Sequence, residues 1–400
     1  MKKNLLLIFV LVLSFVCLFT ACNKAHTDPA TDPVKKVEAL NRPIEHELEF
    51  GGVYIDLTIE QFNALGFSYG DSVDVTFSNG EKIFGIPYYN GYYTQNGQAL
   101  VVAYPGYPFV KVCINNGNDL YVTYNLSEND TCSITLKQKA AFKDIQDARD
   151  IHYEDDRSKF TTDAEFANFR NISVGNLLEN KFYRSASPCD NQHNRAPYVD
   201  TLIHGVHVQF ILNLADNDTK IQGYIAKSDF NSPYFKVLYE TGKVTPIALN
   251  MNYGDDVQPT LLMGTKLGDA AFKNKVIDGF RSLMQSDGPY LIHCTEGKDR
   301  TGFICMLIEA LAGATYQEIV DDYMITYDNY YKITKTKDPT KYNTIVNELL
   351  NPMIESVVGN SSVDYKTVSL VPYAKAWLTN GGMTQTELDT LMTKLVGAGA

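Results

Sequence analysis

One cysteine and one arginine, spaced so that both could face a single bound anion, offer the clearest chemistry in this sequence. Five residues separate Cys294 from Arg300, and residues 293–302 read HCTEGKDRTG. The arginine guanidinium is a rigid fork that matches two oxygens of a phosphate group. A cysteine becomes a strong nucleophile as the thiolate, and nearby positive charge favours that form. The pair therefore predicts a nucleophile beside a phosphate-binding arginine.

The flanking segments predict that this loop lies between a strand and a helix. Residues 288–292 are typical of a turn leading into a short buried strand, and residues 303–311 of a mostly buried helix. A loop that opens a helix presents unpaired backbone N–H groups and the positive end of the helix dipole, which together favour a bound anion. Gly297 and Gly302 permit the tight backbone path and close approach to a ligand.

The chemistry that this arrangement predicts is two-step phosphoryl transfer. Cys294 attacks phosphorus and expels an alcohol or phenol, and water then hydrolyses the phosphocysteine. The loop N–H groups and Arg300 stabilise charge in both steps. Asp299 is the best local candidate for the acid, Lys298 adds positive charge at the rim, and Thr301 can donate a hydrogen bond to the sulfur. No His and carboxylate cluster has ligand spacing, so we expect no metal or other cofactor.

Other residues in and near the loop complete the predicted site. Arg184 could reach a substrate phosphate, or it could pair with an acid on a neighbouring element. His293 could shape the loop and tune the thiolate, or it could be a hydrogen-bonded core histidine, and its place directly before Cys294 favours the first. Phosphate contacts are expected from four loop residues: Thr295, Glu296, Gly297 and Lys298.

The loop resembles that of the cysteine-dependent phosphatase superfamily, and its GKDRTG form is similar to that of the bacterial tyrosine/lipid phosphatases. The resemblance covers roughly residues 141–400. Three further stretches are similar to elements of that family, in the same order: residues 168–172 (NFRNI), 182–186 (FYRSA) and 322–326 (DYMIT).

This resemblance implies hydrolysis of phosphotyrosine and, in some members, of phosphoserine, phosphothreonine or phosphoinositides. It also implies that Asp299 is the general acid and that Lys298 is linked to broad or lipid specificity. One stretch departs from the family: where Asp-Leu-Arg is usual at a strand end, residues 213–218 read NLADND. The missing arginine leaves the substrate contacts there open, and it makes Asp216 and Asp218 rivals of Asp299 as the acid.

Length and composition indicate a globular chain of more than one domain. The 400 residues exceed one ordinary core, and 44% are hydrophobic while 20% are charged. The net charge of −12 and the absence of a basic stripe argue against nucleic acid as a partner. Seven scattered cysteines are too few for a disulfide scaffold, and none forms a Cys-x2-Cys zinc pair.

The N-terminus predicts export and a lipid anchor. Residues 1–21 combine a positive start with a short apolar run, as in a signal peptide, and residues 19–22 (FTAC) resemble a lipoprotein processing box. Lipidation of Cys22 would tether an extracytoplasmic protein to the membrane, whereas ordinary secretion with an incidental Cys22 is the alternative. Residues 22–43 carry several prolines among polar residues, which is typical of a flexible linker.

Residues 44–139 predict a small β domain, either a barrel or a sandwich. Apolar and polar residues alternate over residues 72–77, a hairpin signal follows at Ser78-Asn79-Gly80, and Thr58 with Gln61 predicts a capped helix. Tyrosines are frequent here, and we expect them to fill a half-buried β surface rather than to form a binding face. Further strands are expected at residues 100–104, 109–114, 120–124 and 132–136.

Residues 140–400 predict an α/β domain with a parallel-rich sheet flanked by helices. Continuous apolar runs at residues 208–214 and 244–249 are typical of buried parallel strands. Apolar residues recur at helical spacing over residues 270–284, and capping boxes are expected at Thr315 and Thr384.

Together these patterns predict a membrane-tethered phosphatase for phosphate monoesters, with a phosphorylated protein as the first choice of substrate. The alternative within enzymes is a phosphoinositide or inositol-phosphate phosphatase, which Lys298 favours and Glu296 disfavours. The alternative outside enzymes is a phosphate-binding module without turnover, and the intact Cys294, Arg300 and Asp299 argue against it.

Overall fold

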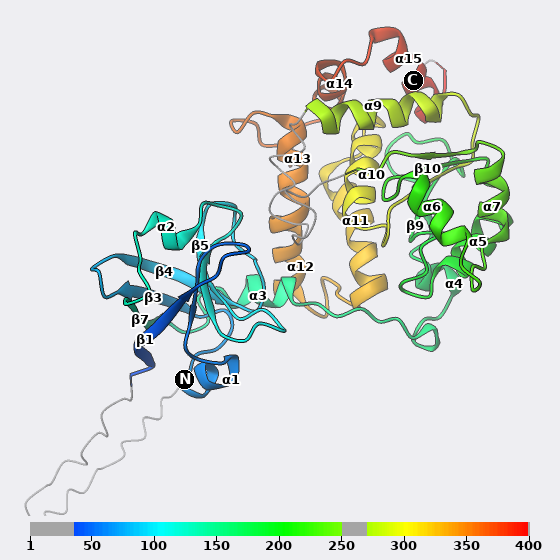
Figure 1. Cartoon of the computed structure of the whole chain (residues 1–400). Coiled ribbons are helices and arrows are strands. Elements are labelled where there is room, and N and C mark those ends of the chain that lie inside the picture. The colour runs from blue at the N-terminus through cyan, green and yellow to red at the C-terminus, as the bar shows by residue number, and fades with distance from the viewer. Residues whose placement is uncertain (1–35, 250–269, 399–400) are drawn as a thin grey trace, which may run out of the picture. The chain divides into compact units, whose positions relative to one another are not determined.

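The computed structural model describes residues 36–249 and 270–398 (Figure 1). The predicted signal peptide, Cys22 and most of the predicted linker lie outside the described residues. Over the two described ranges, none of the helices has both the length and the apolar character needed to cross a membrane.

The first part of the described chain is a closed barrel of seven strands in the order β1-β2-β6-β5-β4-β3-β7. A barrel is one of the two β architectures that the sequence predicts. The expectation that it folds as a separate domain ending near residue 139 stays a prediction. Two short helices, α1 (Ile59–Ala64) and α2 (Leu120–Thr123), accompany the strands. The strands are β1 (Glu38–His46), β2 (Val53–Ile55), β3 (Ser72–Phe77), β4 (Lys82–Tyr89), β5 (Ala99–Val102), β6 (Lys111–Ile114) and β7 (Thr131–Gln138).

Two sequence expectations in the barrel have different outcomes. The capping box of Thr58 and Gln61 is present at the start of α1. The strand predicted over residues 120–124 is wrong, because this segment forms α2: the Asp119 side chain accepts a hydrogen bond from Tyr121 N and caps the helix. A short apolar run does not distinguish a strand from a buried helical turn, so the cap decides.

The tyrosines of the barrel pack against one another. Tyr88 and Tyr89 are buried. The Tyr92 and Tyr107 hydroxyls lie 2.6 Å apart, and the Tyr104 ring lies 5.5 Å from that of Tyr107. These contacts agree with the packing role expected for them.

The second part contains a five-stranded sheet in the order β11-β10-β12-β9-β8. The four strands from β11 to β9 are parallel, and β8 pairs with β9 in the antiparallel sense. His293 lies level with Asn213 on one side and Ser185 on the other, so three strands end at the same edge of the sheet. The strands are β8 (Arg170–Asn171), β9 (Phe182–Ser185), β10 (Phe210–Asn213), β11 (Val244–Pro246) and β12 (Tyr290–His293).

Helices cover both faces of this sheet, as the predicted parallel-rich α/β fold requires. Leu212 and Ile292 belong to a core shared with α9, α10 and α11, whereas their neighbours Ile211 and Leu291 belong to a core shared with α5 and α7. The protein is therefore a mixed α/β protein (Figure 1). The helices are α3 (Lys143–Arg149), η1 (Arg157–Lys159), α4 (Asp163–Phe166), α5 (Ala196–Gly205), α6 (Asp218–Ile225), α7 (Pro233–Glu240), α9 (Ala270–Met284), α10 (Asp299–Leu311), α11 (Tyr316–Tyr331), α12 (Pro339–Ile345), η2 (Val346–Leu350), α13 (Asn351–Val358), α14 (Val371–Asn380) and α15 (Gln385–Val396).

Several helical predictions are confirmed. The helix expected over residues 270–284 is α9, and the predicted capping boxes at Thr315 and Thr384 open α11 and α15. Helix α10 is buried along most of its length, and Phe303 on it contacts the ring of Trp377 on α14, with the ring centroids 5.6 Å apart. These contacts fix the helix that follows the loop of residues 294–298.

Candidate active site

The loop between β12 and α10 follows the strand-loop-helix pattern predicted from the sequence. Gly297 has φ +73°, and a Cβ there would lie 2.2 Å from the carbonyl oxygen of Ser185. A Cβ on Gly302 would lie 2.6 Å from the ring of Tyr323, so this glycine lets α10 pack closely on α11. Glycine is thus required at both positions, at the first by backbone conformation as well as by space.

The polar groups of the loop backbone divide into two sets. In the part of the chain that the structure describes, the N–H groups of Thr295, Glu296, Gly297 and Lys298 meet no acceptor. The carbonyl oxygens, by contrast, all accept hydrogen bonds. Their donors are His293 Nδ1 to Cys294 O (3.0 Å), Ser187 N to Thr295 O (2.9 Å), Asn168 Nδ2 to Glu296 O (3.1 Å), Arg184 Nη2 to Gly297 O (2.9 Å) and Gly302 N to Lys298 O (2.6 Å).

Unpaired N–H donors at the start of a helix form an anion site. Cys294 opens this loop as a free thiol that is 3% exposed. Arg300 donates to Thr295 Oγ1 (3.2 Å) and Ala215 O (3.4 Å), and no carboxylate among residues 36–249 and 270–398 forms an ion pair with it. The guanidinium charge therefore remains available to an anion beside the thiol.

Asp299 has a partly buried carboxyl group, one oxygen of which has no hydrogen-bond partner among the described residues. Its side chain is 14% exposed, and its Oδ1 has no hydrogen-bond partner within the described chain. Burial raises the pKa of Asp299, and the nearby Lys298 ammonium, 3.8 Å from Oδ2, opposes that rise without cancelling it. A carboxyl whose pKa is raised holds its proton to higher pH, as a general acid must.

The two rival carboxyls are engaged elsewhere. Asp216 is 3% exposed, and its carboxylate accepts from Asn213 Nδ2 (3.1 Å) and lies 3.4 Å from the Tyr224 hydroxyl. Asp218 is exposed in the first turn of α6 and accepts from the Tyr239 hydroxyl at 2.9 Å. Of the three carboxyls, Asp299 alone lies at the loop-helix junction and has a buried oxygen without a partner among the described residues.

Lys298 and Glu296 neutralise each other at the rim. Lys298 Nζ lies 3.0 Å from Glu296 Oε2 and donates to the Tyr331 hydroxyl at 3.1 Å, and Tyr153 OH donates to Glu296 Oε1 at 2.7 Å. Burial lowers the pKa of Lys298, but Glu296, with smaller contributions from Tyr331, Asp299 and Tyr327, outweighs it, and the pKa is raised well above its ordinary value. Lys298 is therefore charged, but its charge is paired with a carboxylate of the same loop.

His293 and Thr301 lie behind the loop. Nδ1 of His293 faces the carbonyl of Cys294, so that nitrogen carries the proton, while Nε2 has no partner in the described chain. Burial lowers the pKa of His293 to about 4, which leaves the ring neutral at neutral pH. The Thr301 hydroxyl is buried and likewise without a partner there, so the predicted hydrogen bond to the Cys294 sulfur is absent from this structure.

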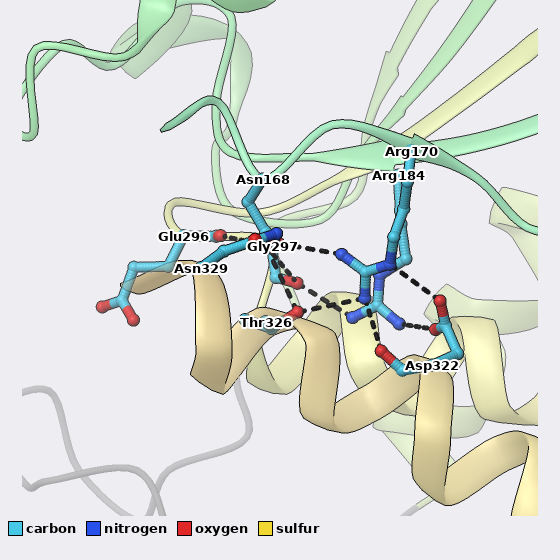
Figure 2. Close-up of polar contacts among 8 residues, drawn as sticks. All are labelled: Asn168, Arg170, Arg184, Glu296, Gly297, Asp322, Thr326 and Asn329. Atoms are coloured by element: carbon cyan, nitrogen blue, oxygen red, sulfur yellow. Dashed lines mark hydrogen bonds and ion pairs between the residues drawn. The ribbon is translucent and has the colours of Figure 1, made fainter. Parts of the chain in front are cut away.

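Arg184 forms the acid pair that was one of its two predicted roles. Its side chain is 1% exposed, its Nη1 binds Asp322 on α11, and its Nη2 donates to Gly297 O (Figure 2). The guanidinium holds the loop from behind through the carbonyl of Gly297. The other predicted role, contact with a substrate phosphate, has no support in this arrangement.

Sequence reasoning missed the residues that approach the loop from distant segments. Ser187, Tyr153 and Tyr331 contact the loop, but none lies in a predicted motif. For Tyr331 a signal existed, because tyrosines at positions 323, 327 and 331 recur at four-residue intervals and share one face of α11. No comparable signal marks the other two residues.

A model of the tyrosine phosphatase family matches residues 165–397. The chain belongs to this family. A tyrosine-protein phosphatase from Nostoc commune is 32% identical over 123 residues, which are 30% of this chain and 40% of that protein. The alignment thus spans less than half the length of that relative. Within its described residues, the chain has no group of three or more His, Cys, Asp and Glu side chains that could hold a metal ion.

Two solved structures are similar to part of this chain. The core catalytic domain of the PP-IP phosphatase SIW14 from S. cerevisiae, in complex with citrate, is 18% identical, with a TM-score of 0.25 over 45% of this chain and 85% of that chain. A second structure, of the Siw14 catalytic core, is 16% identical, with a TM-score of 0.28 over 53% of this chain and 94% of that chain. At these scores neither likeness bears on function.

Proposed function

We propose that this phosphatase hydrolyses phosphate monoesters of phosphorylated proteins, phosphotyrosine first, through a phosphocysteine intermediate on Cys294. One observation carries the proposal. The loop beside Cys294 presents four backbone N–H groups without acceptors, together with an arginine, Arg300, that pairs with no carboxylate in the described chain. Donors aimed at the equatorial oxygens of a phosphoryl group are what this chemistry needs.

In the first step the Cys294 sulfur attacks phosphorus, and the bond from phosphorus to the ester oxygen breaks. Asp299 gives its proton to that oxygen, so the product leaves as a neutral alcohol or phenol. In the second step Asp299 takes a proton from water, the water oxygen attacks phosphorus, and the phosphorus–sulfur bond breaks. Inorganic phosphate leaves, and the Cys294 thiolate and the Asp299 proton are restored.

The charge at the rim favours a substrate with one phosphate over a polyphosphorylated ring. A pocket for inositol phosphates needs several unpaired cations around the loop. Here the cation of Lys298 is paired with Glu296, and two tyrosine hydroxyls contact the same carboxylate. The ring of Tyr331, which is partly exposed, lies near the Lys298 ammonium, with its centroid 5.4 Å away, and supplies an aromatic surface suited to a phenol.

The experiment is phosphate release under reducing conditions with a chelator present. The panel contains a phosphotyrosine peptide, a phosphoserine peptide, a phosphoinositide and inositol hexakisphosphate, each with wild type and Cys294→Ser. We expect the phosphotyrosine peptide to be the best substrate and the variant to lose at least roughly a thousandfold in kcat. Equal turnover by Cys294→Ser would overturn the cysteine mechanism, and preference for an inositol phosphate would overturn the substrate class.

We also propose that the mature protein is a membrane-anchored, extracytoplasmic lipoprotein, on the strength of residues 1–22 of the sequence. Membrane fractions from cells expressing the full chain or its Cys22→Ala variant test this. The wild type should sediment with membranes and carry a lipid mass on Cys22, whereas the variant should not. An unmodified Cys22 in exported protein would favour ordinary secretion.

A further inference from the structure

The three sequence stretches that resemble family elements meet in one cluster behind the loop. Arg170 is the first residue of β8, and Asn168 lies two residues before it. Arg184 lies in β9, and Asp322 lies in α11. Figure 2 shows Asn168 and Arg184 reaching the loop at Gly297 and Asp322 meeting both arginines, with Thr326 and Asn329 of α11 in the same cluster. The cluster is buried, because Asn168 is 0% and Arg184 1% exposed.

Arg170 and Arg184 face each other across two strands, and one acid holds them. They are register partners in the antiparallel β8–β9 pair, where like charges are destabilising. Asp322 binds Nη1 of Arg184 and accepts from Nε of Arg170 at 2.8 Å. This pairing leaves Nη2 of Arg184 free to donate to the carbonyl oxygen of Gly297 at 2.9 Å. A lysine ammonium has no such fork and could not span both acceptors in this geometry.

The amide of Asn168 is oriented in the same way. Its Oδ1 accepts from Arg170 Nη1 (2.8 Å) and Asn329 Nδ2 (3.0 Å), so its Nδ2 must point to the loop. There Nδ2 donates to Glu296 O at 3.1 Å and lies 3.5 Å from Gly297 O. Asn168 has φ +50°, a left-handed conformation that asparagine tolerates better than most residues.

A planar trans peptide links these contacts to the anion site. The carbonyl oxygen of one residue and the N–H of the next point in opposite directions from the same plane. Holding Glu296 O from behind therefore turns the N–H of Gly297 forward, and holding Gly297 O turns the N–H of Lys298 forward. Both of these N–H groups are among those that meet no acceptor in the described part of the chain.

We propose that Asn168, Arg184 and Asp322 are positioning residues, which hold two loop carbonyls so that the N–H groups of Gly297 and Lys298 stay aimed at phosphate. This proposal rests on the proposed function for its link to catalysis, but its direct consequence is affinity for a tetrahedral oxyanion. None of the three residues needs to touch the substrate.

The first test compares Asn168→Gly with Asn180→Gly. Both asparagines have positive φ, +50° and +55°, so glycine removes the amide at each without backbone strain. Asn180 is exposed and does not contact the loop. The readouts are protection of Cys294 from iodoacetamide by inorganic phosphate, kcat and KM for p-nitrophenyl phosphate, and thermal unfolding.

We expect Asn168→Gly to weaken phosphate protection and to lower kcat/KM, each by roughly tenfold or more, and Asn180→Gly to change neither by more than about twofold. If the phosphate protection and the kcat/KM of Asn168→Gly both lie within about twofold of those of Asn180→Gly, the proposal is overturned, even if Asn168→Gly is less stable. Protection of Cys294 by phosphate can be measured even if no substrate is turned over. Failure of the proposed function can therefore be distinguished from failure of the positioning proposal.

The second test compares Arg184→Lys with Arg195→Lys. Arg195 is also 1% exposed and donates to two backbone carbonyls, those of Phe166 and Glu154, which lie outside the loop. We expect similar losses of stability, but a loss of phosphate affinity of roughly tenfold in Arg184→Lys only. Equal phosphate affinity in the two variants would show that Arg184 only stabilises the fold.

Discussion

Arg300 donates a hydrogen bond to the carbonyl oxygen of Ala215, with Nη1 3.4 Å from it. The loop arginine thus rests on the strand end where this sequence departs from its family. The backbone carbonyl of Ala215 accepts this hydrogen bond without adding a side-chain charge, and the hydrogen bond from Arg300 to Thr295 Oγ1 also goes to a neutral group. Among the residues that the structure describes, an incoming phosphate therefore has no ion pair of Arg300 to displace.

Arg300→Lys should test this arrangement most directly. Lysine keeps the charge but loses the fork that reaches two phosphate oxygens. We expect kcat/KM for p-nitrophenyl phosphate to fall by roughly a hundredfold or more, and phosphate to lose most of its protection of Cys294 from iodoacetamide. The unfolding temperature should change little, because the two hydrogen bonds that Arg300 donates within the described chain both go to neutral groups. Full activity in Arg300→Lys would mean that charge alone suffices.

Asp299→Asn should affect poor leaving groups more than good ones. We expect kcat for a phosphoserine peptide to fall by roughly a hundredfold, and kcat for p-nitrophenyl phosphate, whose leaving group needs little protonation, to fall less. Burial raises the pKa of Asp299, so the wild-type rate should persist to higher pH than an exposed carboxyl allows and should then decline. The decline should vanish in Asp299→Asn. If Asp216→Asn instead shows this dependence on the leaving group, Asp216 is the acid.

Glu296→Gln should change substrate preference. The substitution removes the carboxylate that lies 3.0 Å from Lys298 Nζ. The longer contact of 3.8 Å with Asp299 Oδ2 remains, so more of the lysine charge becomes available to a substrate. We expect the ratio of kcat/KM for inositol hexakisphosphate to that for a phosphotyrosine peptide to rise by about tenfold. Tyr153→Phe removes a hydrogen bond to Glu296 but no charge, and should shift the ratio much less. An unchanged ratio in Glu296→Gln would contradict the neutralising role.

Gly297→Ala should destabilise the protein and disable the loop. A Cβ would lie 2.2 Å from Ser185 O, and the residue has φ +73°. We expect a loss of about 2–4 kcal/mol in the free energy of unfolding, measured in urea, together with weakened phosphate binding. Gly223→Ala in α6 is the control, because its Cβ would meet no described residue within 4 Å and alanine favours a helix. Similar stabilities for the two variants would refute the steric argument.

His293 should make stability depend on pH. Burial lowers its folded pKa from 6.5 to about 4, so as pH falls the unfolded chain binds the proton first. Its contribution is present at neutral pH and is lost as pH falls through this window. The loss should reach about 2 kcal/mol by about pH 5. The free energy of unfolding of His293→Gln should fall less over the same range, and equal pH dependence in both proteins would contradict the assignment.

The strand, loop and helix around Cys294 were predictable because each is encoded locally. Continuous apolar runs mark β12 and α10, and the capping boxes of α1, α11 and α15 appear as short spacings. The α2 segment was not predictable from its apolar run, because the deciding contact is one cap by Asp119.

The surroundings of the loop depend on contacts between distant residues. Asp322 was recognised only as part of a family stretch, and its pairing with two arginines 138 and 152 residues away follows from strand register and the placement of α11. Tyr153 reaches Glu296 across 143 residues, and no local pattern specifies that contact. The sequence therefore predicts the chemical groups of the site better than it predicts what holds them.

The contact between Phe303 and Trp377 has a practical consequence. Trp377 is the only tryptophan in the chain, and it lies against the helix that begins at Asp299. The intrinsic fluorescence of the unlabelled protein, excited selectively at tryptophan, therefore comes from one place. Titration with an unreactive oxyanion, followed by this emission, would report whether occupation of the loop alters the packing of the helix behind it.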